Sequence, residues 1–134
     1  MAQDLLVGEH LTSDMIAAGV QLVSALDKLN VLVTGAFWFL MPEQHVWRLI
    51  IVSSEVTISG PKAIYRKIRT AIGKSQDASP VVTTKDVAVI DTRDPLYGLL
   101  RVAVSTGPGI SGVRFSRNVI NGQLIEDAYI YRVT

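Results

Sequence analysis

The chain has 134 residues, of which 49% are apolar and 19% charged, and its 13 basic and 12 acidic side chains leave a formal net charge of +1. This length predicts one domain over residues 1–134, large enough to bury a core without a disulfide or a structural metal. The small net charge excludes an overall field that would steer the protein to nucleic acid or to a membrane surface. The high apolar share predicts that some apolar surface remains for a partner protein.

The sequence contains no cysteine, which excludes disulfides, thiolate metal ligands and a cysteine nucleophile. The N-terminus, Met1–Asp4, lacks the basic start and the apolar run of a signal peptide. No uncharged apolar stretch approaches the ~20 residues that a membrane helix needs. We therefore expect a cytoplasmic protein that has no cofactor and does not associate with a membrane.

In chain order, the first predicted element is an amphipathic helix. Thr12 or Ser13 can cap its N-terminus, and Asp14 lies in its first turn, where a negative charge is favourable. Apolar residues then recur at helical spacing and form one stripe that faces the core. The stripe consists of Met15, Gly19, Leu22, Leu26 and Leu29. Asn30 can adopt the left-handed conformation that ends the helix.

The next two segments predict a β-hairpin. Residues 31–40 form a strand with apolar side chains on both faces, which is typical of a central strand that is covered on both sides. A five-residue loop over residues 41–45 leads to a second strand over residues 46–54. If Leu40 faces Val46, one face of the hairpin becomes an aromatic–aliphatic core. The pairs on that face are Phe39 with Trp47 and Phe37 with Leu49.

Gly60 and Pro61 suit the start of a second helix, which is expected to reach about Ile72. Its apolar stripe is Ile64, Tyr65, Ile68 and Ile72. Its other side is basic, and no acidic residue occurs between Lys62 and Lys74. This face can bind nucleic acid or an anionic ligand through Lys62, Arg66 and Arg69. The alternative is an ordinary solvated surface, which the small net charge and the lack of aromatic residues for base stacking favour.

The C-terminal half is predicted to be rich in β-structure. A polar loop over residues 75–80 precedes a strand over residues 87–91, and a turn over residues 92–95 leads to a returning strand over residues 96–105. Asn121-Gly122 is the strongest short hairpin signal, because both residues accept positive φ.

Pairing Ile120 with Gln123 across this last hairpin sets its register. Arg117 then lies opposite Glu126, Phe115 opposite Ala128, and Val113 opposite Ile130. The other face carries Arg114, Tyr129 and Tyr131. Exposed arginine and tyrosine are enriched in interaction hot spots, so these three residues are candidate binding residues. The alternative is that the tyrosines are ordinary half-buried strand residues.

Few residues suggest catalysis or metal binding. Ser54 and Glu55 follow a core strand, where functional groups often lie, and together with Arg114 they motivate a hydrolase hypothesis. The two histidines, His10 and His45, have no ligating residue at metal-site spacing, so no metal site is predicted. The glycine-rich loop over residues 106–112 precedes a strand rather than a helix, which argues against a phosphate-binding loop.

Several short motifs, spread from the first helix to the C-terminus, are similar to those of small bacterial proteins of unknown function. The motifs are Ala25-Leu26-Asp27, Phe37-Trp38, Trp47-Arg48-Leu49, Ser53-Ser54, Gly60-Pro61 with Ala63 and Tyr65, and the run from Glu126 to Arg132. The resemblance implies a bacterial single-domain protein. It implies no activity, cofactor or site.

Together these patterns predict an α+β fold with two main helices packed on a largely antiparallel sheet of five or six strands. The leading functional hypothesis is a non-enzymatic protein-interaction module that acts as a homodimer or as a subunit beside a larger partner. The first alternative is nucleic-acid or anionic-ligand binding through the basic helix at 62–74. The second is a small hydrolase with a site near Ser54 and Glu55.

Overall fold

The computed structural model describes residues 10–75 and 81–134. Within them, four α-helices and a five-stranded mixed sheet form an α+β fold. The elements are α2 (Ser13–Lys28), β1 (Gly35–Leu40), β2 (Trp47–Val52), α3 (Glu55–Ser59), α4 (Pro61–Ser75), the 3-10 helix η2 (Thr84–Asp86), β3 (Val87–Ile90), α5 (Pro95–Ala103), β4 (Val113–Ile120) and β5 (Gln123–Val133). The N-terminal start and most of the polar loop predicted at 75–80 lie outside the described residues.

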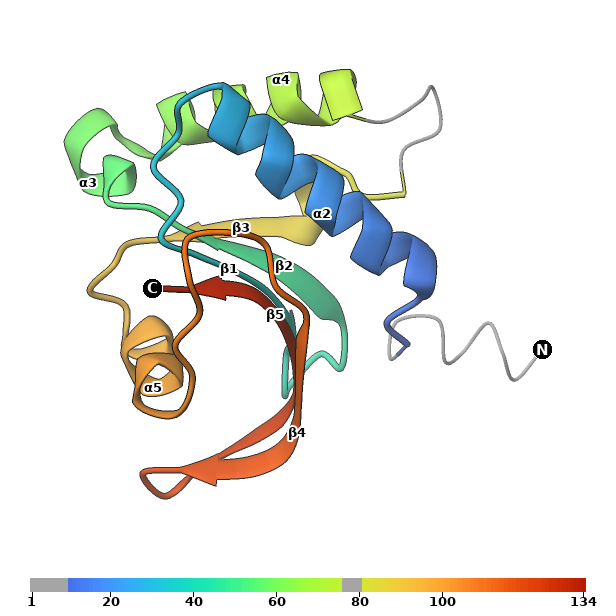
Figure 1. The fold of residues 1–134 in the computed structure, drawn as a ribbon, viewed down its shortest axis with the longest axis vertical. Coiled ribbons are helices and arrows are strands. Elements are labelled where there is room, and N and C mark those ends of the chain that lie inside the picture. Colours follow the sequence, from blue (N-terminus) through green and yellow to red (C-terminus); the bar gives the residue numbers. More distant parts are fainter. Residues whose placement is uncertain (1–9, 76–80) are drawn as a thin grey trace.

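The sheet has the strand order β3-β2-β1-β5-β4 and separates two helical layers. Helices α2, α3 and α4 cover one face, and α5 lies against the other face, where the β4–β5 hairpin curves around it (Figure 1). Strand β1 is central and apolar on both sides, as the sequence predicts, but it begins at Gly35 rather than at residue 31. Two hydrophobic cores result, one on each face of the sheet.

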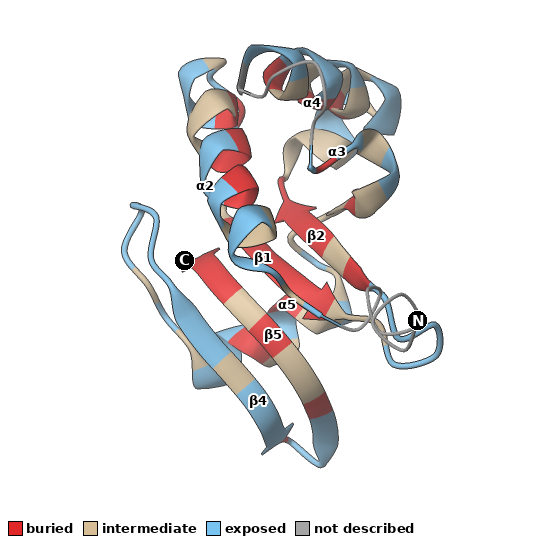
Figure 2. Cartoon of the chain, turned by 90° about the vertical axis from the view of Figure 1, so that its right-hand side faces the viewer, coloured by how far each residue is buried: buried red, intermediate tan, exposed pale blue. Residues whose placement is uncertain are grey.

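The core beneath α2 and α4 is built around Trp38, Leu49 and Ile51 from the sheet, with Leu22, Leu26, Ile64 and Ile68 from the helices. The core on the α5 face is built around Phe37, Ile50 and Ile130, with Tyr97 and Leu100 from α5. Colouring by burial shows that the buried residues concentrate in β1, β2 and β5, whereas β4 is mostly exposed (Figure 2).

The predicted boundaries of α2 are confirmed. The Thr12 hydroxyl accepts a hydrogen bond of 3.1 Å from the Met15 amide, as expected of an N-cap. Asn30 follows the last turn with φ 60°, the left-handed conformation that ends the helix. The buried stripe of α2 consists of Ala18, Gly19, Leu22, Val23 and Leu26.

The predicted register of the β1–β2 hairpin is wrong by one residue. Leu40 pairs with Trp47 rather than with Val46, so Phe39 lies opposite Arg48 and Phe37 opposite Ile50. The connection includes Val46 because the Met41 amide donates to the Val46 carbonyl at 2.9 Å, and His45 closes the loop with φ 55°. As a result Trp38 and Trp47 share the core beneath the helices, while Phe37 and Phe39 belong to the core on the α5 face.

The predicted strand at 87–91 forms as β3, but it pairs with β2 in the parallel direction, so the sheet is mixed. Two parallel neighbours need a crossover connection, and α3 and α4 supply it. The Gly60-Pro61 start predicted for the second helix is confirmed, with Gly60 at φ 85° before Pro61.

The strand predicted at 96–105 is wrong, because this segment forms helix α5. The Asp94 side chain accepts a hydrogen bond of 2.9 Å from the Leu96 amide, and Pro95 occupies the first turn. An aspartate N-cap followed by proline is a helix start, although the same pair also favours turns. Tyr97 and Leu100, three residues apart, form the buried stripe of α5.

The β4–β5 hairpin forms at Asn121-Gly122, with φ 49° and 81°, and its register is confirmed by the pairing of Ile120 with Gln123 and of Phe115 with Ala128. The pairs on either side of Arg117 keep the predicted register, but Arg117 and Glu126 themselves are not bridged, and no ion pair joins them among the described residues. Arg117 has φ 50°, which interrupts the ladder at that position. Arg117 is exposed, and the Glu126 Oε2 atom is buried without a hydrogen-bond partner among the described residues.

Candidate interaction surfaces

The structure brings together three of the predicted binding residues, which lie on the β4–β5 hairpin. Arg114 pairs across the strands with Tyr129, and the Tyr129 ring packs edge-on against Tyr131 with centroids 5.5 Å apart. The Arg114 guanidinium makes two hydrogen bonds to the Asp127 carboxylate, of 2.7 and 2.6 Å, and lies 5.5 Å from the centre of the Trp47 ring. Arg114 is therefore held by its own chain.

The same contacts shift the pKa values of the ion pair. The hydrogen bond to Asp127 is the main reason that the pKa of Arg114 is raised. Partial burial raises the pKa of Asp127, but the hydrogen bonds from Arg114 and Ser116 outweigh this effect, so the pKa of Asp127 is lowered. Both groups are consequently ionised near neutral pH, and neither is poised to exchange a proton.

Tyr131 is fully buried and belongs to the core rather than to the surface. Its hydroxyl accepts a hydrogen bond of 2.9 Å from Trp38 Nε1 and donates one of 2.7 Å to the Ile16 carbonyl of α2. Burial raises the pKa of this hydroxyl. Tyr131 therefore ties α2 to the sheet, and of the predicted hot-spot residues only Arg114 and Tyr129 reach solvent.

The other three predicted binding residues, Lys62, Arg66 and Arg69, lie on α4 and are exposed. Helix α4 packs beside β3 at one edge of the sheet, where the Tyr65 hydroxyl accepts a hydrogen bond from the Val89 amide. Because β4 forms the opposite edge, the structure does not unite the basic helix and the Arg114 cluster in one site.

The residues of the hydrolase hypothesis do not form a catalytic arrangement, and Glu55 is engaged in structural contacts. The Glu55 carboxylate accepts a 2.7 Å hydrogen bond from the Leu32 amide and forms an ion pair of 3.3 Å with Lys67. Ser54 precedes α3 as its N-cap residue, and its side chain makes no capping hydrogen bond. Neither residue lines the groove between α2 and α4, the groove beside Arg132 or the groove beside α5, and neither does Arg114.

The described residues contain no cluster of three or more histidine and acidic side chains that could hold a metal ion. His10 and His45 are both exposed. Among the described residues, no helix combines the length and the apolar character needed to cross a bilayer.

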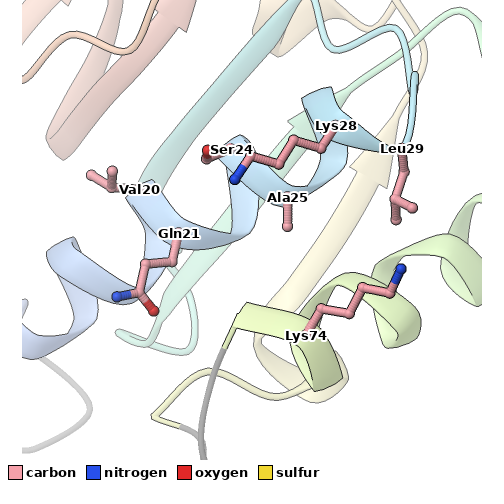
Figure 3. Close-up of a pocket in the computed structure, with 7 residues that line it drawn as sticks. All are labelled: Val20, Gln21, Ser24, Ala25, Lys28, Leu29 and Lys74. Carbon is pink, nitrogen blue, oxygen red and sulfur yellow. The ribbon is translucent and has the colours of Figure 1, made fainter.

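One groove, of about 530 Å³, lies between α2 and the end of α4. Figure 3 shows Ala25 and Leu29 pointing from α2 toward α4, with Lys74 rising from α4 toward Leu29. Lys28 extends along α2 toward Ser24, so the two ammonium groups point in different directions (Figure 3). The two lysines therefore do not converge on one point where they could bind an anion together.

A second groove, of about 390 Å³, adjoins the ion pair between buried Arg132 and exposed Asp27. Arg132 is 5% exposed in its side chain and makes two hydrogen bonds to Asp27, of 3.0 and 2.9 Å, at the end of α2. It also donates to the carbonyls of Val33 and Gly109. These bonds account for four of its five N–H groups, so Arg132 is a structural clamp between α2, β5 and two loops.

The third groove, of about 460 Å³, separates α5 from the β4–β5 turn, and we refer to it as the α5 groove. None of its lining residues is charged. They are Phe39, Pro42, Pro95, Leu96, Gly98, Leu99, Asn121, Gln123, Leu124 and Ile125. The sequence pattern does not predict this site, because the groove depends on residues 95–103 forming a helix in which Leu96 and Leu99 share a side.

Exposed apolar residues adjoin the α5 groove. Val119 and Leu124 pair across the hairpin and are 67% and 59% exposed. Val102, one helical turn beyond Leu99, is 61% exposed. A groove without charged walls beside protruding apolar side chains is typical of a surface that a partner covers.

The chain matches no protein-family model, no curated protein and no solved structure.

Proposed function

We propose that the protein is a non-enzymatic interaction module and that its docking surface is the α5 groove with the adjoining Val119–Leu124 pair. The observation that carries this proposal is the uncharged lining of the groove. The other two grooves contain lysines or an ion pair. Removing charge-free apolar surface from water stabilises a complex without the cost of desolvating ions.

The partner that this surface suits best is a second copy of the chain, giving a homodimer. A two-fold interface uses the same patch on both subunits, so the patch must be complementary to itself. Here a recess and a protruding apolar pair lie side by side, and Leu124 belongs to both. The protruding pair of one copy can therefore fill the recess of the other while receiving the same contact in return.

Static light scattering after size exclusion tests the homodimer, with Leu124→Glu as the disruptive variant. We expect the wild-type protein to have twice the chain mass of 14.6 kDa and Leu124→Glu to have the monomer mass. Leu124 is 59% exposed, so the substitution should leave the fold intact. Circular dichroism of Leu124→Glu and of the wild type checks that the secondary structure is unchanged.

The matched control is Ile58→Glu, which places the same charge at a residue of α3 that is 79% exposed and lies on the other side of the sheet. This variant should remain dimeric. A wild-type monomer at high protein concentration, or a dimer that Ile58→Glu dissociates and Leu124→Glu does not, would show that the α5 groove is not the self-association surface.

A further inference from the structure

A stripe of three cations runs along the exposed side of α4. Lys62, Arg66 and Arg69 are spaced four and three residues apart, so the geometry of the helix places them on one face. All three are exposed. At a rise of 1.5 Å per residue, the stripe extends for about 10 Å along the helix axis.

Nothing among the described residues neutralises this stripe. Helix α4 contains no acidic residue, and none of the three cations forms an ion pair with a described side chain. Lys67, on another side of the same helix, is the contrast, because it is paired with Glu55. Although the whole chain has a net charge of only +1, α4 therefore concentrates positive charge at one place.

The residue types on this face suit phosphate groups better than a protein surface. None of the exposed large apolar residues of the described chain lies on α4, whereas protein interfaces rely on apolar and aromatic anchors. Arginine and lysine are the residues that contact nucleic-acid phosphates. The one aromatic ring of α4, Tyr65, is half-buried against the core and bonded through its hydroxyl to the Val89 amide, so the stripe offers no free ring on which unpaired bases could stack, which favours a duplex over a single strand.

We propose that the Lys62–Arg66–Arg69 stripe binds the phosphate backbone of duplex nucleic acid without reading its sequence. This binding uses a different surface from the α5 groove and does not depend on the proposed self-association. Each cation that neutralises a phosphate releases condensed counterions, so the affinity must fall as salt rises. Gly73 continues the stripe one turn beyond Arg69, and space around it is open.

Fluorescence anisotropy with short labelled DNA and RNA duplexes, measured over a series of salt concentrations, tests the proposal. Three phosphate contacts predict a slope of about −2.7 in a plot of log affinity against log salt. Arg66→Ala and Arg69→Ala should each reduce the steepness of the slope by about 0.9, and Gly73→Lys should increase it by about 0.9. Arg101→Ala, which removes an exposed cation from α5, is the control and should leave the slope unchanged.

Binding of either duplex with these slopes supports the proposal. It is overturned if neither duplex binds at low salt, or if the slope is the same after Lys62, Arg66 and Arg69 are all replaced by alanine. Labelled poly-glutamate provides the remaining comparison. If it binds more tightly than both duplexes and loses affinity in the same variants, the stripe serves an acidic protein partner and the nucleic-acid proposal is wrong.

Discussion

At the scale of single residues, the close approach of α2 to the sheet depends on a glycine and a tyrosine. The Tyr131 hydroxyl lies against Gly19, where a Cβ atom would overlap the phenol ring and its oxygen. This approach allows Tyr131 to donate to the Ile16 carbonyl while it accepts from Trp38 Nε1. The sequence places Gly19 on the buried stripe, but only the tertiary contact explains why no side chain is present there.

Replacing Gly19 with alanine should therefore destabilise the protein, although alanine is the better helix former. The added methyl group must displace Tyr131 from a packed core, and such overpacking costs about 1–3 kcal/mol. Gly73→Ala on α4 is the matched control, because open space surrounds that position. It should stabilise the protein by up to about 1 kcal/mol. Urea denaturation measures both effects, and a Gly19→Ala variant as stable as the wild type or more stable would contradict the packing described for Tyr131.

At the scale of secondary-structure elements, local signals predicted the elements whose ends are marked by capping or turn residues. Thr12, Asn30 and the Gly60-Pro61 pair set helix ends, and Asn121-Gly122 sets the last hairpin. Each signal acts through the conformation or the hydrogen bond of one or two residues. Such signals are readable without knowledge of the rest of the chain.

The errors occurred where a local signal was ambiguous or where tertiary pairing decided the outcome. Asp94-Pro95 suits both a turn and a helix start. The helix forms because it packs Tyr97 and Leu100 together against the sheet. The parallel direction of β3 follows from the α3–α4 crossover rather than from its own residues. The β1–β2 register depends on whether Val46 belongs to the loop or to β2, and in the structure it belongs to the loop. Because β1 is apolar on both faces, its sequence is compatible with either register.

The β4–β5 hairpin carries an ion pair whose effect on stability should depend on pH. The lowered pKa of Asp127 means that the folded protein holds this proton less tightly than the unfolded chain does. The contribution of Asp127 to stability is then fully present above its unfolded value of about 3.9 and is lost as the pH falls through the lower, folded value.

Comparing the wild type with Asp127→Asn over an acid pH series isolates this effect. The difference in unfolding free energy between the two proteins should be largest near neutral pH and should shrink on acidification below about pH 4. Denaturant unfolding at each pH provides the measurement. A difference that stays constant or grows toward acid would mean that the contact with Arg114 does not lower the pKa of Asp127.

At the scale of the whole molecule, the two faces of the sheet differ in how completely the helices cover them. Three helices lie over one face, and the nine-residue α5 alone lies over the other, so the α5 groove remains between this helix and the hairpin turn. The apolar surplus of the sequence predicts a surface of this kind but not its location. The location depends on α5, and the residues of α5 were predicted to form a strand.

The basic stripe of α4 lies in the other helical layer, near the β3 edge, so the two proposed surfaces are spatially separate. Of the predicted candidates, Lys62, Arg66 and Arg69 keep free side chains among the described residues, whereas Arg114 and Tyr131 are held by hydrogen bonds within the fold. Charge and amphipathic spacing therefore located the stripe from sequence, while hydrogen-bond partners had to come from the structure.

The central claim is that two copies associate through the α5 groove, and distances between spin labels test it most directly. The chain has no native cysteine, so Val102→Cys, one helical turn beyond the groove-lining Leu99, and Gly73→Cys on α4 each introduce a single labelling site. In a two-fold dimer, equivalent residues beside the interface lie close together. We predict a short intermolecular distance for the label at position 102 and a clearly longer one for the label at position 73. No intermolecular distance in either variant, or a shorter distance at position 73 than at position 102, would contradict the account.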